Sequence, residues 1–143
     1  MKTLFLLVLA LLALLSCTAQ GASVLNTEAT TYSQELFEQI NQYRRDKGLP
    51  ALRFDPLLSS LAKVHSTDMA QQETMNHNNF DDRFERAGSR LCVENVGWNF
   101  RSAREMYEAW RRSSNHNRNM LHREITRAGI AEVDMYVTFL ACK

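Results

Sequence analysis

Hydrophobic residues recur every three or four positions in two segments of the chain, a pattern typical of helices with one buried face. In the first segment these positions are Leu36, Ile40 and Tyr43. Thr31 and Gln34 form a capping box before them, which predicts a helix that begins there and ends before Gly48. In the second segment the positions are Leu58, Leu61, Ala62, His65 and Met69, and Asp55–Pro56 supplies the start signal.

The second half of the chain mixes helical and strand patterns. Beyond a polar stretch at 71–79, we expect a short helix at 80–87, a strand at 91–98 interrupted by Asn95 and Gly97, and a helix at 103–112. Residues 128–133 and 136–142 are rich in β-branched and aromatic residues and predict a hairpin turning at Asp134 and Met135. The order of elements favours an α+β domain, with helices packed on a small antiparallel sheet.

The N-terminus has the pattern of an export signal. Residues 4–15 are all Leu, Phe, Val or Ala, a run of 12 that follows Lys2. Such a run is too short to span a bilayer, which takes about 20 residues, but it suits the core of a secretory signal. We therefore expect a signal peptide at 1–21, a linker at 22–31 and one globular domain at 32–143.

Cys17 directly follows the apolar run and allows two interpretations. Leu14–Leu15–Ser16–Cys17 resembles a bacterial lipobox, in which the cysteine is acylated and becomes the first mature residue. The alternative is ordinary signal cleavage a few residues later, after Ala19 or Gly21. Both interpretations place the domain in the cell envelope or outside the cell.

The charge and the cysteine content limit the classes of protein to which the chain can belong. The chain has 17 basic and 16 acidic residues, and loss of Lys2 with the signal leaves 16 of each, which disfavours a nucleic-acid binder held by bulk charge. Cys92 and Cys142 are the only cysteines of the globular part, and in an oxidising compartment we expect them to form a disulfide. A catalytic thiol is the less favoured alternative.

Four motifs in order resemble the CAP superfamily of cysteine-rich secretory, antigen-five and pathogenesis-related proteins, also called the SCP domain. They lie at 40–52 (including Asn41 and Arg44), at 62–69, at 94–97 (Glu-Asn-Val-Gly) and at 110–121 (Trp-Arg-Arg-Ser-Ser-Asn-His-Asn-Arg-Asn-Met-Leu). The similarity covers about residues 32–142 and is strongest to the short bacterial secreted branch. It implies an α-β-α sandwich with a solvent-open cavity.

The resemblance also implies three cavity residues. His77 matches the first family histidine, Glu94 the glutamate of the Glu-Asn motif, and His116 the second histidine. Where the family's eukaryotic members often have another glutamate just after the tryptophan, this chain has Arg111 and Arg112, so that fourth cavity residue is absent or supplied elsewhere.

Two imidazoles and a carboxylate suit Zn²⁺ or another divalent ion, so His77, His116 and Glu94 are candidate metal ligands. The alternative is a hydrogen-bonded cluster that ties loops to the sheet. His65 lies on an apolar helix stripe, where a structural role is favoured.

Several functions stay open from the sequence. The leading hypothesis is a non-enzymatic, exported protein that binds a lipid, a cell-wall polymer or a protein, and contacts membranes only through a lipid anchor at Cys17. One alternative is a metal-dependent hydrolase with Glu94 as catalytic general base. Another is a lipid- or sterol-binding module.

Overall fold

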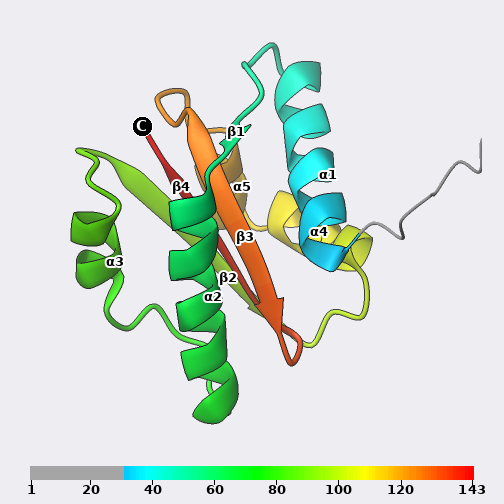
Figure 1. Cartoon of the computed structure of the whole chain (residues 1–143). Coiled ribbons are helices and arrows are strands. Elements are labelled where there is room, and N and C mark those ends of the chain that lie inside the picture. The colour runs from blue at the N-terminus through cyan, green and yellow to red at the C-terminus, as the bar shows by residue number, and fades with distance from the viewer. Residues whose placement is uncertain (1–30) are drawn as a thin grey trace, which may run out of the picture.

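The computed structural model describes residues 31–143 (Figure 1). The predicted signal peptide, Cys17 and the predicted linker up to residue 30 lie outside these residues. The helices are α1 (Tyr32–Asp46), α2 (Pro56–Gln71), α3 (Phe80–Arg86), α4 (Ala103–Arg112) and α5 (Ser114–Met120). The strands are β1 (Arg53–Phe54), β2 (Cys92–Trp98), β3 (Arg127–Val133) and β4 (Tyr136–Cys142).

Most elements confirm the sequence pattern, and the helix starts show why. The Thr31 hydroxyl accepts a hydrogen bond from the Gln34 backbone amide, and the Gln34 side chain accepts one from the Thr31 backbone amide. The predicted capping box therefore begins α1. Asp55 caps α2 through the amides of Leu57 and Leu58. Three details differ from prediction: β2 runs without interruption, and neither the two-residue β1 nor α5 was anticipated.

The sheet has the strand order β1-β3-β4-β2. The pairs β3–β4 and β4–β2 are antiparallel as predicted, whereas β1 pairs with the start of β3 in parallel. Cys92 lies directly opposite Cys142 in the β2–β4 register, and the two form a disulfide. The predicted cross-link is therefore confirmed, and it fastens the last strand to the strand that carries Glu94.

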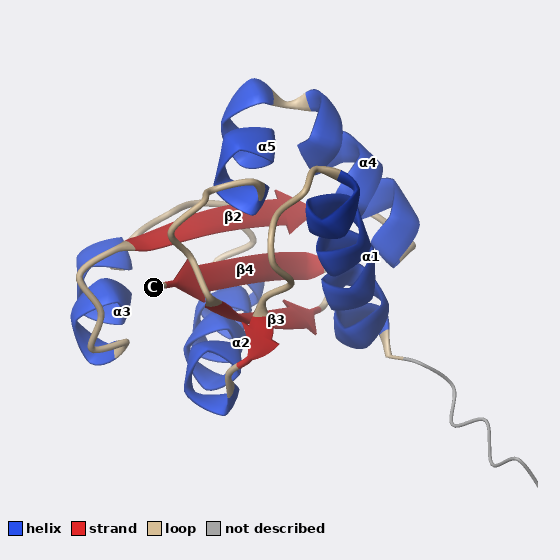
Figure 2. Ribbon diagram, turned by 90° about the horizontal axis from the view of Figure 1, so that it is seen from above, coloured by secondary structure: helices blue, strands red, loops and turns tan. Residues whose placement is uncertain are grey.

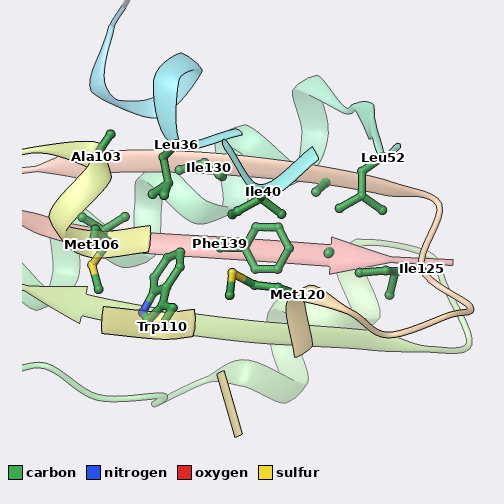
Figure 3. Packing of buried hydrophobic residues seen from close by; sticks show 13 residues of the cluster. Leu36, Ile40, Leu52, Ala103, Met106, Trp110, Met120, Ile125, Ile130 and Phe139 are labelled. Carbon is green, nitrogen blue, oxygen red and sulfur yellow. The ribbon is translucent and has the colours of Figure 1, made fainter. Parts of the chain in front are cut away.

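Helices cover both faces of this sheet, which confirms the expected sandwich (Figure 2). On one face α1, α4 and α5 enclose the larger core, in which Trp110 and Phe139 lie with ring centroids 6.2 Å apart (Figure 3). On the other face α2 packs against β3 and β4 through Leu58, Leu61 and Ala62. This second contact is close, because a Cβ atom on Gly129 would overlap the backbone of Leu58 and Ser59.

The motif around Asn41 and Arg44 has a structural role. The Asn41 side chain both donates to the Leu52 carbonyl (3.0 Å) and accepts from the Leu52 amide (2.7 Å). Arg44 is fully buried, and its guanidinium donates to backbone carbonyls, at 3.0 Å to Pro50 and 2.8 Å to Met120. The Arg44 guanidinium also donates to the carbonyls of His122 and Ile125. These bonds hold the end of α1 against the loop between α5 and β3.

Candidate functional site

Glu94 is the centre of a polar cluster beneath the edge strand β2. Its side chain is 2% exposed, although most carboxylates lie in water. Oε1 accepts from His77 Nδ1 at 2.9 Å and from Arg83 Nη2 at 2.8 Å, while Oε2 accepts from Arg83 Nε at 2.7 Å. The carboxylate is therefore paired with one guanidinium and oriented toward one imidazole.

Arg83 is the site residue that sequence reasoning missed. It lies on α3, its side chain is 5% exposed, and its remaining terminal nitrogen donates to the Asn78 carbonyl at 2.7 Å. The signal available in the sequence was weak, since arginine in a short polar helix usually faces solvent. The two parallel bonds make this a bidentate pair, which fixes the carboxylate plane.

His77 lies in the connection between α2 and α3, with its side chain 53% exposed. Because a carboxylate oxygen only accepts, the bond to Glu94 places the proton on Nδ1 and leaves the Nε2 lone pair free. This is the arrangement in which a histidine binds a metal or a hydrogen-bond donor while a carboxylate orients its ring.

His65 is buried in α2, as its place on the apolar stripe predicts. Its Nε2 donates to the Asn76 carbonyl at 2.9 Å and lies 3.9 Å from Glu94 Oε1. Burial lowers the pKa of His65, and the Arg83 charge acts in the same direction. His65 is thus a neutral imidazole that anchors the loop before His77.

His116 lies on α5 and approaches the edge of β2 from the opposite face of the sheet. The neighbouring residue Asn95 donates to the His116 carbonyl at 3.0 Å, and Asn119 donates to the Glu94 carbonyl at 3.0 Å. Successive strand residues face opposite sides, so Asn95 meets α5 while Glu94 faces α2 and α3. Burial lowers the pKa of His116, and repulsion from His77 adds a smaller effect in the same direction.

The pKa of Glu94 reflects competing influences. Burial alone would raise it, but the hydrogen bonds from His77 and Arg83, together with the Arg83 charge, offset burial and hold the pKa below its usual value. Glu94 is consequently ionised at neutral pH and is a weak proton acceptor.

His77, Glu94 and His116, the three candidate metal ligands, differ in their hydrogen-bond partners. Within residues 31–143, no three histidine, cysteine or acidic side chains are grouped to hold an ion. His77 and Glu94 meet directly, whereas no hydrogen bond or ion pair among the described residues joins His116 to Glu94. By their chemistry the imidazoles of His77 and His116 are suitable ligands for a divalent ion, whereas Glu94 is bonded to His77 and Arg83 and acts as a hydrogen-bond partner rather than as a ligand.

Sandwich architecture, the Glu-Asn strand motif and the two histidines define a CAP-type domain. The model of the cysteine-rich secretory protein family matches residues 37–136, and the chain belongs to that family. An uncharacterised protein of Bacillus subtilis, YkwD, is 25% identical over 115 residues, covering 76% of this chain and 45% of that protein. The chain therefore spans less than half of this curated relative.

Solved structures show the same fold. An extracellular SCP-domain protein of Bacillus anthracis superimposes with a TM-score of 0.75 at 24% identity, over 78% of this chain and 40% of that one. An outer surface protein of Borrelia burgdorferi has a TM-score of 0.68 at 20% identity, over 76% and 90% of the two chains. Among residues 31–143, no helix combines the length and apolar character needed to cross a membrane.

Proposed function

We propose that this domain is a non-enzymatic ligand-binding protein that acts outside the cell or in the cell envelope. Its ligand contacts the exposed imidazole of His77 at the edge of β2, and His116 is the second candidate contact. The observation that carries the proposal is the bond from His77 Nδ1 to buried Glu94, which orients the ring of a side chain that is 53% exposed and leaves the Nε2 lone pair unused.

A divalent metal ion such as Zn²⁺ is the ligand to test first. Neutral imidazoles are good ligands for Zn²⁺, and an outer carboxylate on the second ring nitrogen strengthens such binding. With only two protein ligands, the remaining positions would be left to water or to a second molecule, so we expect weak and reversible binding.

Binding without catalysis agrees better with the electrostatics than hydrolysis does. A general base should have a pKa near the working pH, whereas contacts from Arg83 and His77 lower that of Glu94. Bidentate pairing with Arg83 also occupies both carboxylate oxygens. These contacts favour an orienting role for Glu94.

Location outside the cytoplasm is supported by the apolar N-terminal run and by relatives described as extracellular or outer-surface proteins. If Cys17 is acylated, Cys17→Ser should shift the protein from the membrane fraction to the soluble fraction or block its maturation. If ordinary cleavage occurs, the wild-type protein is soluble and its N-terminus is Gln20 or Ala22.

Calorimetric titration of Zn²⁺ into the mature domain tests the metal proposal. We expect binding at pH 7.5 that weakens at pH 5.5, because protonated imidazoles cannot bind metal. His77→Ala and His116→Ala should each abolish most of the binding, and Glu94→Gln should weaken it about 10–100-fold as an outer partner.

His122→Ala is the matched control, because the His122 side chain forms no hydrogen bond or ion pair with Glu94 or His77 in the described residues. Thermal melts run beside the titrations separate lost ligands from lost folding. Absence of binding to the wild-type domain at pH 7.5 rejects the metal and leaves a cluster that ties loops to the sheet.

A further inference from the structure

The edge of β3 lacks a paired strand over most of its length, although residues 128–131 are themselves buried. On the side away from β4, β1 pairs only with Arg127 and Ala128. Within residues 31–143, no strand pairs with residues 129–133 on that side. In Figure 1 this part of β3 lies between α1 and α2. An unpaired strand edge presents a row of backbone donors and acceptors.

Register identifies the free backbone groups. The Asp55 amide donates to the Ala128 carbonyl at 2.9 Å, so Ala128 presents its backbone groups to β1. Alternation along an antiparallel strand places the backbone groups of Ile130 and Glu132 on the same side. The Ser59 hydroxyl donates to the Ile130 carbonyl at 3.3 Å. Among the described residues, no other hydrogen bond reaches the amides of Ile130 and Glu132 or the Glu132 carbonyl on this side. Ile130 is 4% exposed and Glu132 is half-buried, so a binding partner reaches these groups only from within the groove that residues 130–132 line.

A groove lies over this edge. It has a volume of about 580 Å³ and is bounded by the first turns of α1, the first half of α2, β1 and residues 130–132. Its apolar floor includes Phe37 and Phe54, whose rings meet edge to face with centroids 6.1 Å apart. Phe54 is 60% exposed, the largest exposed fraction among the large hydrophobic residues of the described chain.

Acidic side chains outnumber basic ones in the groove. Glu38 and Glu132 line it, against one cation, Lys63. Tyr32 also lines the groove, where burial raises its pKa and Glu132, Glu105 and Glu35 raise it further. The lining therefore carries a net negative charge, and a cationic side chain of a ligand would be favoured there.

We propose that this groove binds an extended peptide of alternating apolar and basic residues, which adds to the sheet as a strand along β3. Its backbone pairs with Ile130 and Glu132, its apolar side chains pack on Phe37 and Phe54, and its basic side chains face the glutamates. Strand addition to an open edge gains affinity from main-chain hydrogen bonds and specificity from alternate side chains. An acyl chain would fill the groove but leave these amides unpaired. The site is separate from the His77–His116 edge.

Fluorescein-labelled hexapeptides that alternate Lys with Val, Leu or Phe test the proposal against the domain spanning residues 22–143. We expect saturable changes in anisotropy, and in ¹⁵N-labelled protein we expect shifts of the Ile130 and Glu132 amide signals. Methylation of alternate peptide nitrogens, or exchange of Lys for Glu, should each weaken binding by about tenfold, the equivalent of one or two hydrogen bonds.

Phe54→Ala should weaken binding by a similar factor, whereas Met75→Ala is the control, since Met75 is also exposed but lies outside the groove. Both variants remove surface side chains and should stay folded, which melts verify. The proposal fails if no peptide shifts the two amides, or if N-methylated and parent peptides bind equally. Binding of sodium myristate in the groove with no peptide binding would assign it to lipid and also overturn the proposal.

Discussion

Arg83 and Glu94 form two parallel hydrogen bonds of 2.7 and 2.8 Å, although both side chains are almost completely buried. This pair joins α3 to β2, and Arg83 is the only buried residue of α3, although Phe80 packs partly buried against the core. Together with the packing of Phe80, this ion pair fixes the position of α3, and with it the loop that carries His77.

Replacement of Arg83 should be strongly destabilising. Arg83→Met leaves a buried carboxylate without its cation, which typically costs about 3–5 kcal/mol. Arg83→Met combined with Glu94→Leu should recover most of that loss, because no unpaired charge remains. Urea unfolding of the single and double variants measures both effects. Arg86→Met, at an exposed pair with Asp82, is the control and should change stability by less than about 1 kcal/mol. Equal losses for Arg83→Met and Arg86→Met would contradict the buried-pair interpretation.

The stability of the domain should fall as the pH drops below 6.5. Burial in the folded state lowers the pKa of His65 and of His116 from 6.5. Below pH 6.5 these two imidazoles are therefore more protonated in the unfolded chain than in the folded one. The free energy of unfolding consequently decreases from pH 6.5 down to the lowered values. Glu94, whose folded pKa lies below 4.5, adds a further loss at more acidic pH.

His65→Gln keeps a donor for the Asn76 carbonyl but does not titrate, so its unfolding free energy should vary less between pH 7.5 and 5.5 than that of the wild type. Urea unfolding in the presence of EDTA measures this, and His122→Gln is the control. An unchanged pH dependence in His65→Gln would show that this imidazole contributes nothing to it.

Two strand glycines should respond differently to alanine. At Gly129 the new Cβ meets the backbone of α2, which cannot move without shifting the helix, so Gly129→Ala should cost the upper end of the ~1–3 kcal/mol typical of overpacking. At Gly97 the Cβ meets the flexible end of Met106, which can adopt another rotamer. Gly97→Ala should therefore be the milder variant in thermal and urea melts. The reverse order would disprove the assumed rigidity of the α2–β3 contact.

Loss of the disulfide should reduce stability substantially. The bridge closes a loop with a sequence separation of 50, for which the chain-entropy relation gives about 4 kcal/mol. The double variant Cys92→Ala, Cys142→Ala should lose stability of that order in urea. Peptide mapping of the wild-type protein without reductant should recover the two cysteines as one cross-linked pair. Two freely alkylatable thiols in the exported protein would contradict this prediction.

Local signals were enough to predict most of the fold. Capping residues and helical spacing located α1, α2 and α4, and the β-branched runs located the final hairpin. The short elements escaped because their stability comes from tertiary contacts. β1 has two residues and exists through its pairing with β3, while α5 is held by Met120 in the core and by Asn95 and Asn119.

The candidate site was predictable only in part, because sequence patterns indicate residues but not which face they meet. The family resemblance selected His77, Glu94 and His116. Adjacent strand positions then send Glu94 and Asn95 to opposite faces, which separates the carboxylate from the His116 side of the strand. The partner that Glu94 acquires instead, Arg83, lies 11 residues away on another element, and no periodicity links the two.

Arg44 recognises the loop before β3 only through main-chain oxygens, at Met120, His122 and Ile125. None of these bonds depends on which side chain the loop residue carries. The loop can thus exchange its exposed residues over evolutionary time while its path stays fixed, provided that the arginine is retained. A loop constrained in shape and free in composition is a favourable place for related proteins to diversify what they display on their surface.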